Sequence, residues 1–249
     1  MYDQKVASFF ETDLFGLYST SHDLALKQLD ACNAVLENVL DIGCGTGWFL
    51  EKLVDNYNGL GFSGSDSSLH MLEIARSKPK LANLSIFRSN LQQLNQLVPA
   101  QSFDMVSLHY VLSYVPKEIA FPIIAKLITP GGLFSLATMT KENSFSALQK
   151  LAGFIDKDEA DSLSHTPSGK EDLLAYIESS GLFKVEMWNT LERSMPFESR
   201  DQLSDFIFRS GWVLEVAEKY QSDIERAIQD IKLPIQERFC SEVILLRSE

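Results

Sequence analysis

The feature that most constrains the fold is a glycine-rich turn directly after a short apolar run. Residues 38–42 read NVLDI, and the chain continues through Gly43, Cys44, Gly45, Thr46 and Gly47 into the helical pattern WFLEKLVDNY. Alternate glycines permit a left-handed backbone and leave no Cβ between the backbone and a ligand. The first N–H groups of the following helix face the same point. This order predicts a strand, a binding turn and a helix.

The same alternation of apolar runs and helical patterns continues along the chain. Strand-like runs follow at 59–66, 84–89, 103–110 and 132–140, with amphipathic helical stretches between them. This alternation predicts a parallel sheet covered on both faces. Two more strand-like runs, 183–195 and 239–248, lie beyond it. We therefore expect an α/β fold with a doubly wound, mostly parallel, Rossmann-like sheet of seven strands.

The pattern favours one domain over residues 1–249. Residues 1–37 read as helices that form a lid or lead into the sheet, and residues 38–140 form the ligand-binding core. Two helical stretches, about 199–209 and 212–231, interrupt the later part. Ligands of such sheets bind at the carboxyl ends of the strands. We therefore interpret 141–169 and 196–235 as insertions that fold over that edge and form a substrate cap.

Charge and composition limit the kinds of molecule that the chain is expected to bind. Against 22 basic residues there are 34 acidic ones, a formal net charge of −12. Such a surface repels phosphate backbones and anionic lipid. Apolar stretches fall short of the ~20 residues that span a bilayer, and residues 1–13 lack the order of a secretion signal. We expect a cytoplasmic protein, monomeric or dimeric, that acts on a small molecule without nucleic acid or membrane.

The scattered cysteines indicate neither a disulfide framework nor a metal site. Cys32, Cys44 and Cys240 are odd in number and lack metal-ligand spacing. A reducing compartment suits them.

Two acidic residues specify the ligand of the glycine turn. Asp66 ends the second strand, nineteen residues beyond Gly47, where a carboxylate accepts both hydroxyls of a ribose. A dinucleotide turn is G-x-G-x-x-G, whereas this turn is G-x-G-x-G preceded by Asp41. A carboxylate there repels a pyrophosphate and suits a ligand with ammonium and sulfonium charges. S-adenosylmethionine is such a ligand, so a nicotinamide-dependent oxidoreductase is disfavoured.

Five segments then carry a family resemblance over residues 38 to 140. VLDIGCGTGWFLEKL resembles motif I of the class I S-adenosylmethionine-dependent methyltransferases, and GSDSSLHMLEIAR is similar to the segment after their second strand. FRSNLQQL, FDMVSLHYVLSYVP and LITPGGLFSLATM resemble the ends of the third, fourth and fifth strands. Asn90 stands where an Asp is commoner. The resemblance implies an enzyme that transfers a methyl group and releases S-adenosylhomocysteine.

The turn and the resemblance together give a set of expected cofactor contacts. The first strand and turn contact the methionine and ribose end, Asp66 contacts the ribose, and the third strand's end contacts adenine. Met71 taken alone suits a core position, and Cys44 is a small residue tolerated between glycines. The full expected set is Asp41, Gly43, Cys44, Gly45, Gly47, Asp66, Ser67, Met71, Asn90, Leu91 and His109.

Candidate catalytic groups are few. His109 and Tyr110 end the fourth strand, and Tyr18 and His22 lie on the amino-terminal helix. We take His109, Tyr18 and His22 as catalytic candidates, although His109 also suits a contact to the cofactor and His22 suits a surface or core position. No Asn/Asp-Pro-Pro-Tyr/Phe element follows the fourth strand, which argues against methylation of adenine or glutamine nitrogen.

The acceptor is expected to be a carboxylate or hydroxyl oxygen. The outer layout resembles the trans-aconitate and malonyl-acyl-carrier-protein carboxyl methyltransferases, both of which methylate carboxylates. Candidate anion-binding residues are Lys141, Arg193, Arg200 and Arg209. N- or C-methylation of a small metabolite, and a non-catalytic cofactor-binding regulator, stay open as alternatives.

Overall fold

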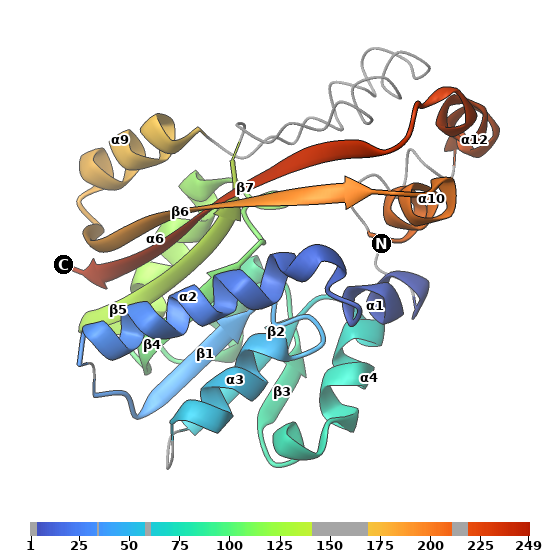
Figure 1. Cartoon of the computed structure of the whole chain (residues 1–249). Helices are drawn as coiled ribbons and strands as arrows, with labels where there is room; N and C mark the ends of the chain where they lie inside the picture. The colour runs from blue at the N-terminus through green and yellow to red at the C-terminus, as the bar shows by residue number, and fades with distance from the viewer. Residues whose placement is uncertain (1–3, 34, 58–60, 141–168, 211–218) are drawn as a thin grey trace.

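The computed structural model describes residues 4–33, 35–57, 61–140, 169–210 and 219–249 (Figure 1). The predicted insertion 141–169 lies outside the described residues except for Gly169, as does the first part of the stretch 212–231. No helix in the described ranges is long and apolar enough to cross a membrane.

Seven strands form one sheet in the order β3-β2-β1-β4-β5-β7-β6. The first five are parallel, and β7 runs antiparallel to both β5 and β6. This confirms the doubly wound, mostly parallel α/β fold. The strands are β1 (Asn38–Ile42), β2 (Gly61–Asp66), β3 (Ser85–Arg88), β4 (Phe103–His109), β5 (Ile128–Met139), β6 (Phe183–Phe197) and β7 (Ile235–Ser248).

Helices cover both faces of the sheet (Figure 1). One face packs against α2 (Leu17–Ala31), α3 (Trp48–Asn56) and α4 (Leu69–Ser77), whose buried apolar residues form one core cluster with the sheet. The other face packs against α6 (Lys117–Leu127) and α9 (Lys170–Ser180) in a second cluster. The remaining short elements are α1 (Gln4–Phe10), η1 (Leu14–Gly16), η2 (Pro79–Leu81), η3 (Leu91–Gln93) and α5 (Leu94–Leu97).

The last two strands extend past the carboxyl end of β5. In the strand pairing, residues 235–240 of β7 pair only with β6. This extended ribbon carries α10 (Arg200–Arg209) and α12 (Gln221–Asp230), which form a third apolar cluster with its inner face and with Leu17 of α2. Figure 1 shows α1, α10 and α12 gathered at this end of the molecule. Their arrangement is compatible with the predicted cap, which stays a prediction.

The turn between β1 and α3 has the backbone that its glycines permit. Gly43, Gly45 and Gly47 have φ values of 69°, 54° and 84°. A Cβ on Gly47 would lie 2.4 Å from Cδ1 of Leu81 and 3.3 Å from Cβ of Ala75. Gly47 is therefore required both for its left-handed φ and for the close packing of η2 and α4 against the turn.

We predict that Gly47→Ala destabilises the chain more than Gly181→Ala does. Gly181 also has a left-handed φ, 61°, but nothing lies within 4 Å of a Cβ there. The Gly181 variant should lose about 1 kcal/mol of unfolding free energy from strain alone. The Gly47 variant should lose roughly 2–4 kcal/mol, because overpacking adds to the strain. Urea unfolding measures both, and equal losses would contradict the packing role.

Candidate functional site

The predicted site residues converge at the carboxyl edge of β2, β1 and β4. The turn after β1 is fastened to the end of β2, because the N–H groups of Gly43 and Cys44 both donate to the carbonyl oxygen of Ser65, at 2.7 and 3.0 Å. The N–H of Gly45 donates to Oδ2 of Asp66 at 2.9 Å. The glycine backbone and the carboxylate at the end of the second strand are therefore in direct contact at this edge of the sheet, which we call the crevice.

Asp66 is held by backbone donors on both carboxylate oxygens. Oδ1 accepts the N–H of Ser68 at 2.8 Å while Oδ2 accepts that of Gly45. Burial raises the pKa of Asp66 although these backbone hydrogen bonds act to lower it. Each carboxylate oxygen offers about two acceptor positions, so donors from a ligand can bind beside the backbone N–H groups. The geometry suits a pair of ribose hydroxyls.

Asp41 is a buried acid on β1, only 2% exposed. Its Oδ1 accepts the hydroxyl of Ser107 on β4 at 2.6 Å. Burial raises the pKa of Asp41 to about 7, with the negative charge of Asp66 adding to the effect and the Ser107 hydrogen bond opposing it. A cationic ligand would lower the free-energy cost of ionising Asp41 in this buried position, because an opposite charge nearby favours the ionised form.

His109 and His22 lie together on the α2 face of the sheet. Their rings stack with centroids 5.3 Å apart, and both contact Phe49 of α3. Burial lowers the pKa of His22 to about 3, helped by Lys52, and burial with His22 nearby lowers that of His109 well below its usual value. Both imidazoles are therefore neutral at physiological pH. Nε2 of His109 is 3.0 Å from the hydroxyl of Ser135.

Four buried polar atoms around the crevice lack a hydrogen-bond partner among the described residues. They are Nδ1 of His22, Nδ1 of His109, Oγ1 of Thr46 and Oγ of Ser65. Buried polar groups normally have partners. Together with the two carboxylates and the left-handed glycine turn, these atoms fit a polar, cationic nucleoside such as S-adenosylmethionine.

Tyr18, one turn before His22 on α2, packs in an aromatic group with Phe10 and Tyr110. Its ring meets Phe10 at 4.3 Å and Tyr110 edge-on at 5.1 Å. Tyr110 follows β4 with a φ of 61°, which is strained for a bulky residue. Its hydroxyl is 3.4 Å from that of Ser241 on β7, and burial raises its pKa to about 12. The catalytic candidates thus fall into two groups, the imidazole pair and the tyrosines.

The expected adenine contacts divide into exposed and buried side chains. Asn90 and Gln93 cap η3 reciprocally, each side chain accepting the other's backbone N–H. Leu91 is buried in the second core cluster, so its backbone rather than its side chain is available to a ligand. Ser67 is exposed at the end of β2. Met71 is buried by Val6, Ala7 and Phe10 of α1.

Alpha helix 1 covers part of this crevice. Cε1 of Phe10 lies 3.7 Å from the position a Cβ on Gly45 would take, and Sδ of Met71 lies 4.0 Å from it. A cofactor that lies against Gly45 has to displace Phe10. The predicted lid of residues 1–37 is compatible with this contact.

The structure adds two serines that the sequence analysis did not single out. The strand register pairs Asp41 with Ser107 and Ser107 with Ser135, so these hydroxyls form a polar row beneath α2. The signal was the spacing of Ser107 and His109, two residues apart on one strand, which places both on one face of the sheet. Ser135 lies on β5 and had no such local signal.

The described arginines expected to bind an anion are engaged elsewhere. Arg193 donates to the hydroxyl of Thr20, and Arg200 donates to the carbonyl oxygen of Gln229 at 3.1 Å. Arg209 lies over the ring of Phe9 and within 3.5 Å of Asp205. Lys141 lies outside the described residues.

The strand order and the antiparallel β7 give the fold of the class I S-adenosylmethionine-dependent methyltransferases. Residues 39–132 match the protein family described as "Methyltransferase domain", and the chain carries that domain. The resemblance noted in the sequence is thereby confirmed, and S-adenosylmethionine is the cofactor of this family.

Curated relatives include proteins named as methyltransferases. A malonyl-[acyl-carrier protein] O-methyltransferase 2 from Ilyobacter polytropus is 25% identical over 49% of this chain and 46% of its own length. A trans-aconitate 2-methyltransferase from Rhizobium leguminosarum is 28% identical over 41% of this chain and 38% of its own length. The chain therefore spans less than half of the length of these relatives. A carboxy-S-adenosyl-L-methionine synthase from Campylobacter jejuni is 24% identical over 79% of this chain and 93% of its own length.

Solved structures share the fold. The YcgJ protein from Bacillus subtilis superposes with a TM-score of 0.61 at 18% identity, covering 93% of this chain and 99% of that chain. The plantazolicin methyltransferase BpumL, solved with a pentazolic desmethylPZN analog and SAH, superposes with a TM-score of 0.54 at 12% identity, covering 96% and 90% of the two chains.

We predict that Asp41→Asn stabilises the ligand-free chain at neutral pH. A carboxyl whose folded pKa is about 7 binds more protons when folded than when unfolded between pH 4 and 7. Stability therefore falls as pH rises through that window, and the loss is complete above pH 7. The variant should lack this loss and gain, relative to wild type, roughly 2–4 kcal/mol between pH 4 and pH 8.

Urea unfolding of both proteins at several pH values measures this difference. The buried imidazoles of His22 and His109 also make stability depend on pH, but they are present in both proteins and cancel. Parallel profiles for the two proteins would show that Asp41 ionises without cost.

Proposed function

We propose that the chain transfers the methyl group of S-adenosylmethionine to an oxygen atom of a small molecule, with a carboxylate as the acceptor. The observation that carries the cofactor half is the pair of acids beside the glycine turn: Asp66 accepts the N–H of Gly45, and the charge of Asp66 acts on Asp41. Asp41 suits a ligand with ammonium and sulfonium charges and would repel a pyrophosphate, and Asp66 suits the hydroxyls of a ribose.

Each site residue is assigned to the part of the cofactor that would lie beside it. Asp41 and the turn glycines Gly43, Gly45 and Gly47 hold the methionine and ribose end, with His109 beside them. Asp66 holds the ribose hydroxyls, and the end of β3 contacts adenine. The support is positional, since β2, β1 and β4 are neighbours in the sheet and end at one edge. When bound, the cofactor supplies the activated methyl group.

A carboxylate acceptor is supported by the weak basicity of the two imidazoles and by the raised pKa of Tyr110. A general base works best with a pKa near the operating pH. Burial moves the pKa of His22 down to about 3 and that of Tyr110 up to about 12, and it moves that of His109 well below its usual value. A hydroxyl or amine acceptor has to lose a proton, whereas a carboxylate is already ionised. The relatives named for malonyl-acyl-carrier protein and trans-aconitate agree with a carboxylate.

A second candidate is synthesis of a modified cofactor. The relative named carboxy-S-adenosyl-L-methionine synthase aligns over more of this chain than the carboxyl methyltransferases do. The two functions differ in product. Methyl transfer releases S-adenosylhomocysteine and a methyl ester, whereas cofactor modification releases a new sulfonium nucleoside, and chromatography of the reaction mixture separates these outcomes.

We predict that Asp66→Ala weakens binding of S-adenosylhomocysteine by about 1.5–3 kcal/mol, the value of hydrogen bonds to a charged group. Isothermal titration calorimetry measures the affinity. Asp104→Ala is the matched control, because Oδ2 of Asp104 also accepts two backbone N–H groups, those of Glu37 and Asn38, at 2.9 and 3.0 Å. Glu37 and Asn38 lie at the amino end of β1, whereas the glycine turn follows its carboxyl end.

Both variants leave two backbone N–H groups without their acceptor, so both should lose stability. Only the Asp66 variant should lose affinity. Equal affinity of the Asp66 variant and wild type would remove Asp66 from the cofactor site. Failure of the wild-type chain to bind either form of the cofactor would overturn the proposed function.

A further inference from the structure

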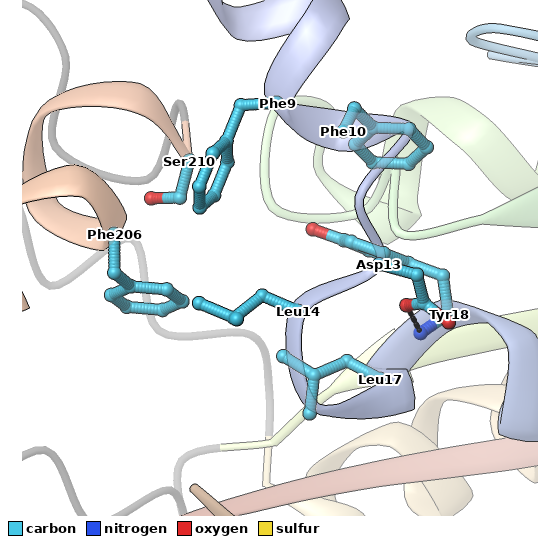
Figure 2. Close-up of a pocket in the computed structure, with 8 residues that line it drawn as sticks. All are labelled: Phe9, Phe10, Asp13, Leu14, Leu17, Tyr18, Phe206 and Ser210. Carbon is cyan, nitrogen blue, oxygen red and sulfur yellow. Dashed lines mark hydrogen bonds between the residues drawn. The ribbon is translucent and has the colours of Figure 1, made fainter. Parts of the chain in front are cut away.

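A narrow cavity lies between the amino-terminal segment and α10 (Figure 2). Its walls are four aromatic rings and two leucines, contributed by Phe9, Phe10, Tyr18, Phe206, Leu14 and Leu17. Figure 2 shows Phe9, Leu14 and Phe206 pointing into the same space, with the Tyr18 hydroxyl directed towards it. This apolar and aromatic lining is of the kind that surrounds the apolar part of a bound small molecule.

The cavity adjoins the cofactor crevice through two shared side chains. Phe10 lines the cavity and also lies 3.7 Å from the Cβ position of Gly45. Tyr18 lines the cavity and meets Tyr110, the residue after β4, at 5.1 Å. One layer of aromatic rings therefore separates the cavity from the glycine turn and from the end of β4.

The charges around the cavity disfavour a ligand that carries a negative charge on the part inside the cavity. Asp13 is the one charged residue among the described residues that line it. The carboxylate of Asp13 accepts the N–H groups of Tyr18 and Ser19 at 2.8 and 3.1 Å, so it is held in place. Arg209 lies over the ring of Phe9, 5.3 Å from its centroid, but it is 40% exposed and pairs with Asp205.

We propose that the acceptor is an apolar acid with a single carboxylate, whose hydrocarbon or aromatic body occupies this cavity. The proposal rests on the proposed function, since the lone carboxylate has to face the sulfonium. A second carboxylate would be buried against apolar walls and Asp13, which costs free energy unless a cation pairs with it. The substrate class therefore differs from trans-aconitate, the multiply charged acid named for one relative.

The transfer step needs no base. A carboxylate oxygen forms a bond to the methyl carbon while the carbon–sulfur bond breaks, and its electron pair stays on sulfur. The sulfonium becomes a neutral thioether, the carboxylate becomes a methyl ester, and no proton moves. The poor bases at the site are consistent with this balance.

The cavity has to widen to admit such an acid. Its volume is about 20 Å³, which is room for about one water molecule. The connection between α1 and α2 contains three left-handed residues in four, Asp13, Phe15 and Gly16, with φ of 40°, 68° and 66°. Strained connections of this kind often mark segments that move with ligand binding. Movement of this segment away from α10 would open both the cavity and the crevice.

The test compares acids that share a body and differ in charge. Formation of S-adenosylhomocysteine is measured with 3-phenylpropanoate and 3-(4-carboxyphenyl)propanoate, and with hexanoate and adipate. We expect kcat/KM to be at least tenfold higher for the monocarboxylate of each pair. Equal or higher values for the dicarboxylates would overturn the inference while leaving carboxyl methylation intact.

Neutral and amine analogues separate the two proposals. Methylation of 3-phenylpropanol or 3-phenylpropylamine in preference to the acid would overturn the carboxylate acceptor, and with it the inference. Thermal shift of the protein saturated with S-adenosylhomocysteine gives a readout without turnover. An unchanged melting temperature with both monocarboxylates would overturn the inference, even where calorimetry shows that the cofactor binds.

A charge introduced at the cavity wall should change the selectivity. Leu14 is half-buried and points into the cavity (Figure 2), so Leu14→Arg should lower the monocarboxylate preference at least tenfold by pairing with a second carboxylate. Leu97→Arg is the matched control, because Leu97 is an exposed residue of α5. This variant should prefer monocarboxylates as strongly as the wild type does. An unchanged preference in a folded Leu14 variant would contradict the assignment of this cavity. Circular dichroism checks that the variants fold. The comparison of mono- and dicarboxylates with the wild-type protein tests the proposal even if the Leu14 variant does not fold.

Discussion

The glycine turn after β1 is fastened to the end of β2 by three backbone N–H groups, and the site is built on that attachment. Two of these groups bind the carbonyl oxygen of Ser65 and the third binds the carboxylate of Asp66. The attachment holds the turn open in a left-handed backbone, aims α3 at the crevice and places Asp66 beside the glycines. Neighbouring strands then bring Asp41, Ser107 and His109 to the same edge.

The crevice tolerates groups that a purely structural core would avoid. A buried carboxyl with a raised pKa, two stacked neutral imidazoles and four buried polar atoms without partners among the described residues all lie near the turn. Each of these costs folding free energy in the ligand-free chain. Their concentration at one edge is typical of a binding site, where stability is given up for recognition. The apolar cavity beside it has the opposite character, so the two regions suit different parts of a reaction.

Sequence reasoning predicted the parallel part of the fold because the signals there are local. Each strand from β1 to β5 overlaps a strand-like run, and the turn residues and helix patterns between the strands are contiguous in the chain. The placement of β7 between β5 and β6 was not predictable in this way, since it depends on pairings between distant segments. The extension of β6 and β7 beyond the sheet had no local signal either. The predicted cap and lid stay predictions, and part of the cap lies outside the described residues.

The candidate site divides along the same line. The sequence alone determined the glycine turn, the two acids and the class of ligand, because these follow from residue type and spacing within one βαβ unit. Only the tertiary structure decided that His22 stacks on His109 while Tyr18 packs on Tyr110, and that Ser135 contacts the imidazole. The partners of the arginines were likewise decided by the tertiary structure, because they depend on which residues the fold places beside each guanidinium. Local spacing encodes backbone geometry, whereas contacts between distant segments arise only when the helices pack on the sheet.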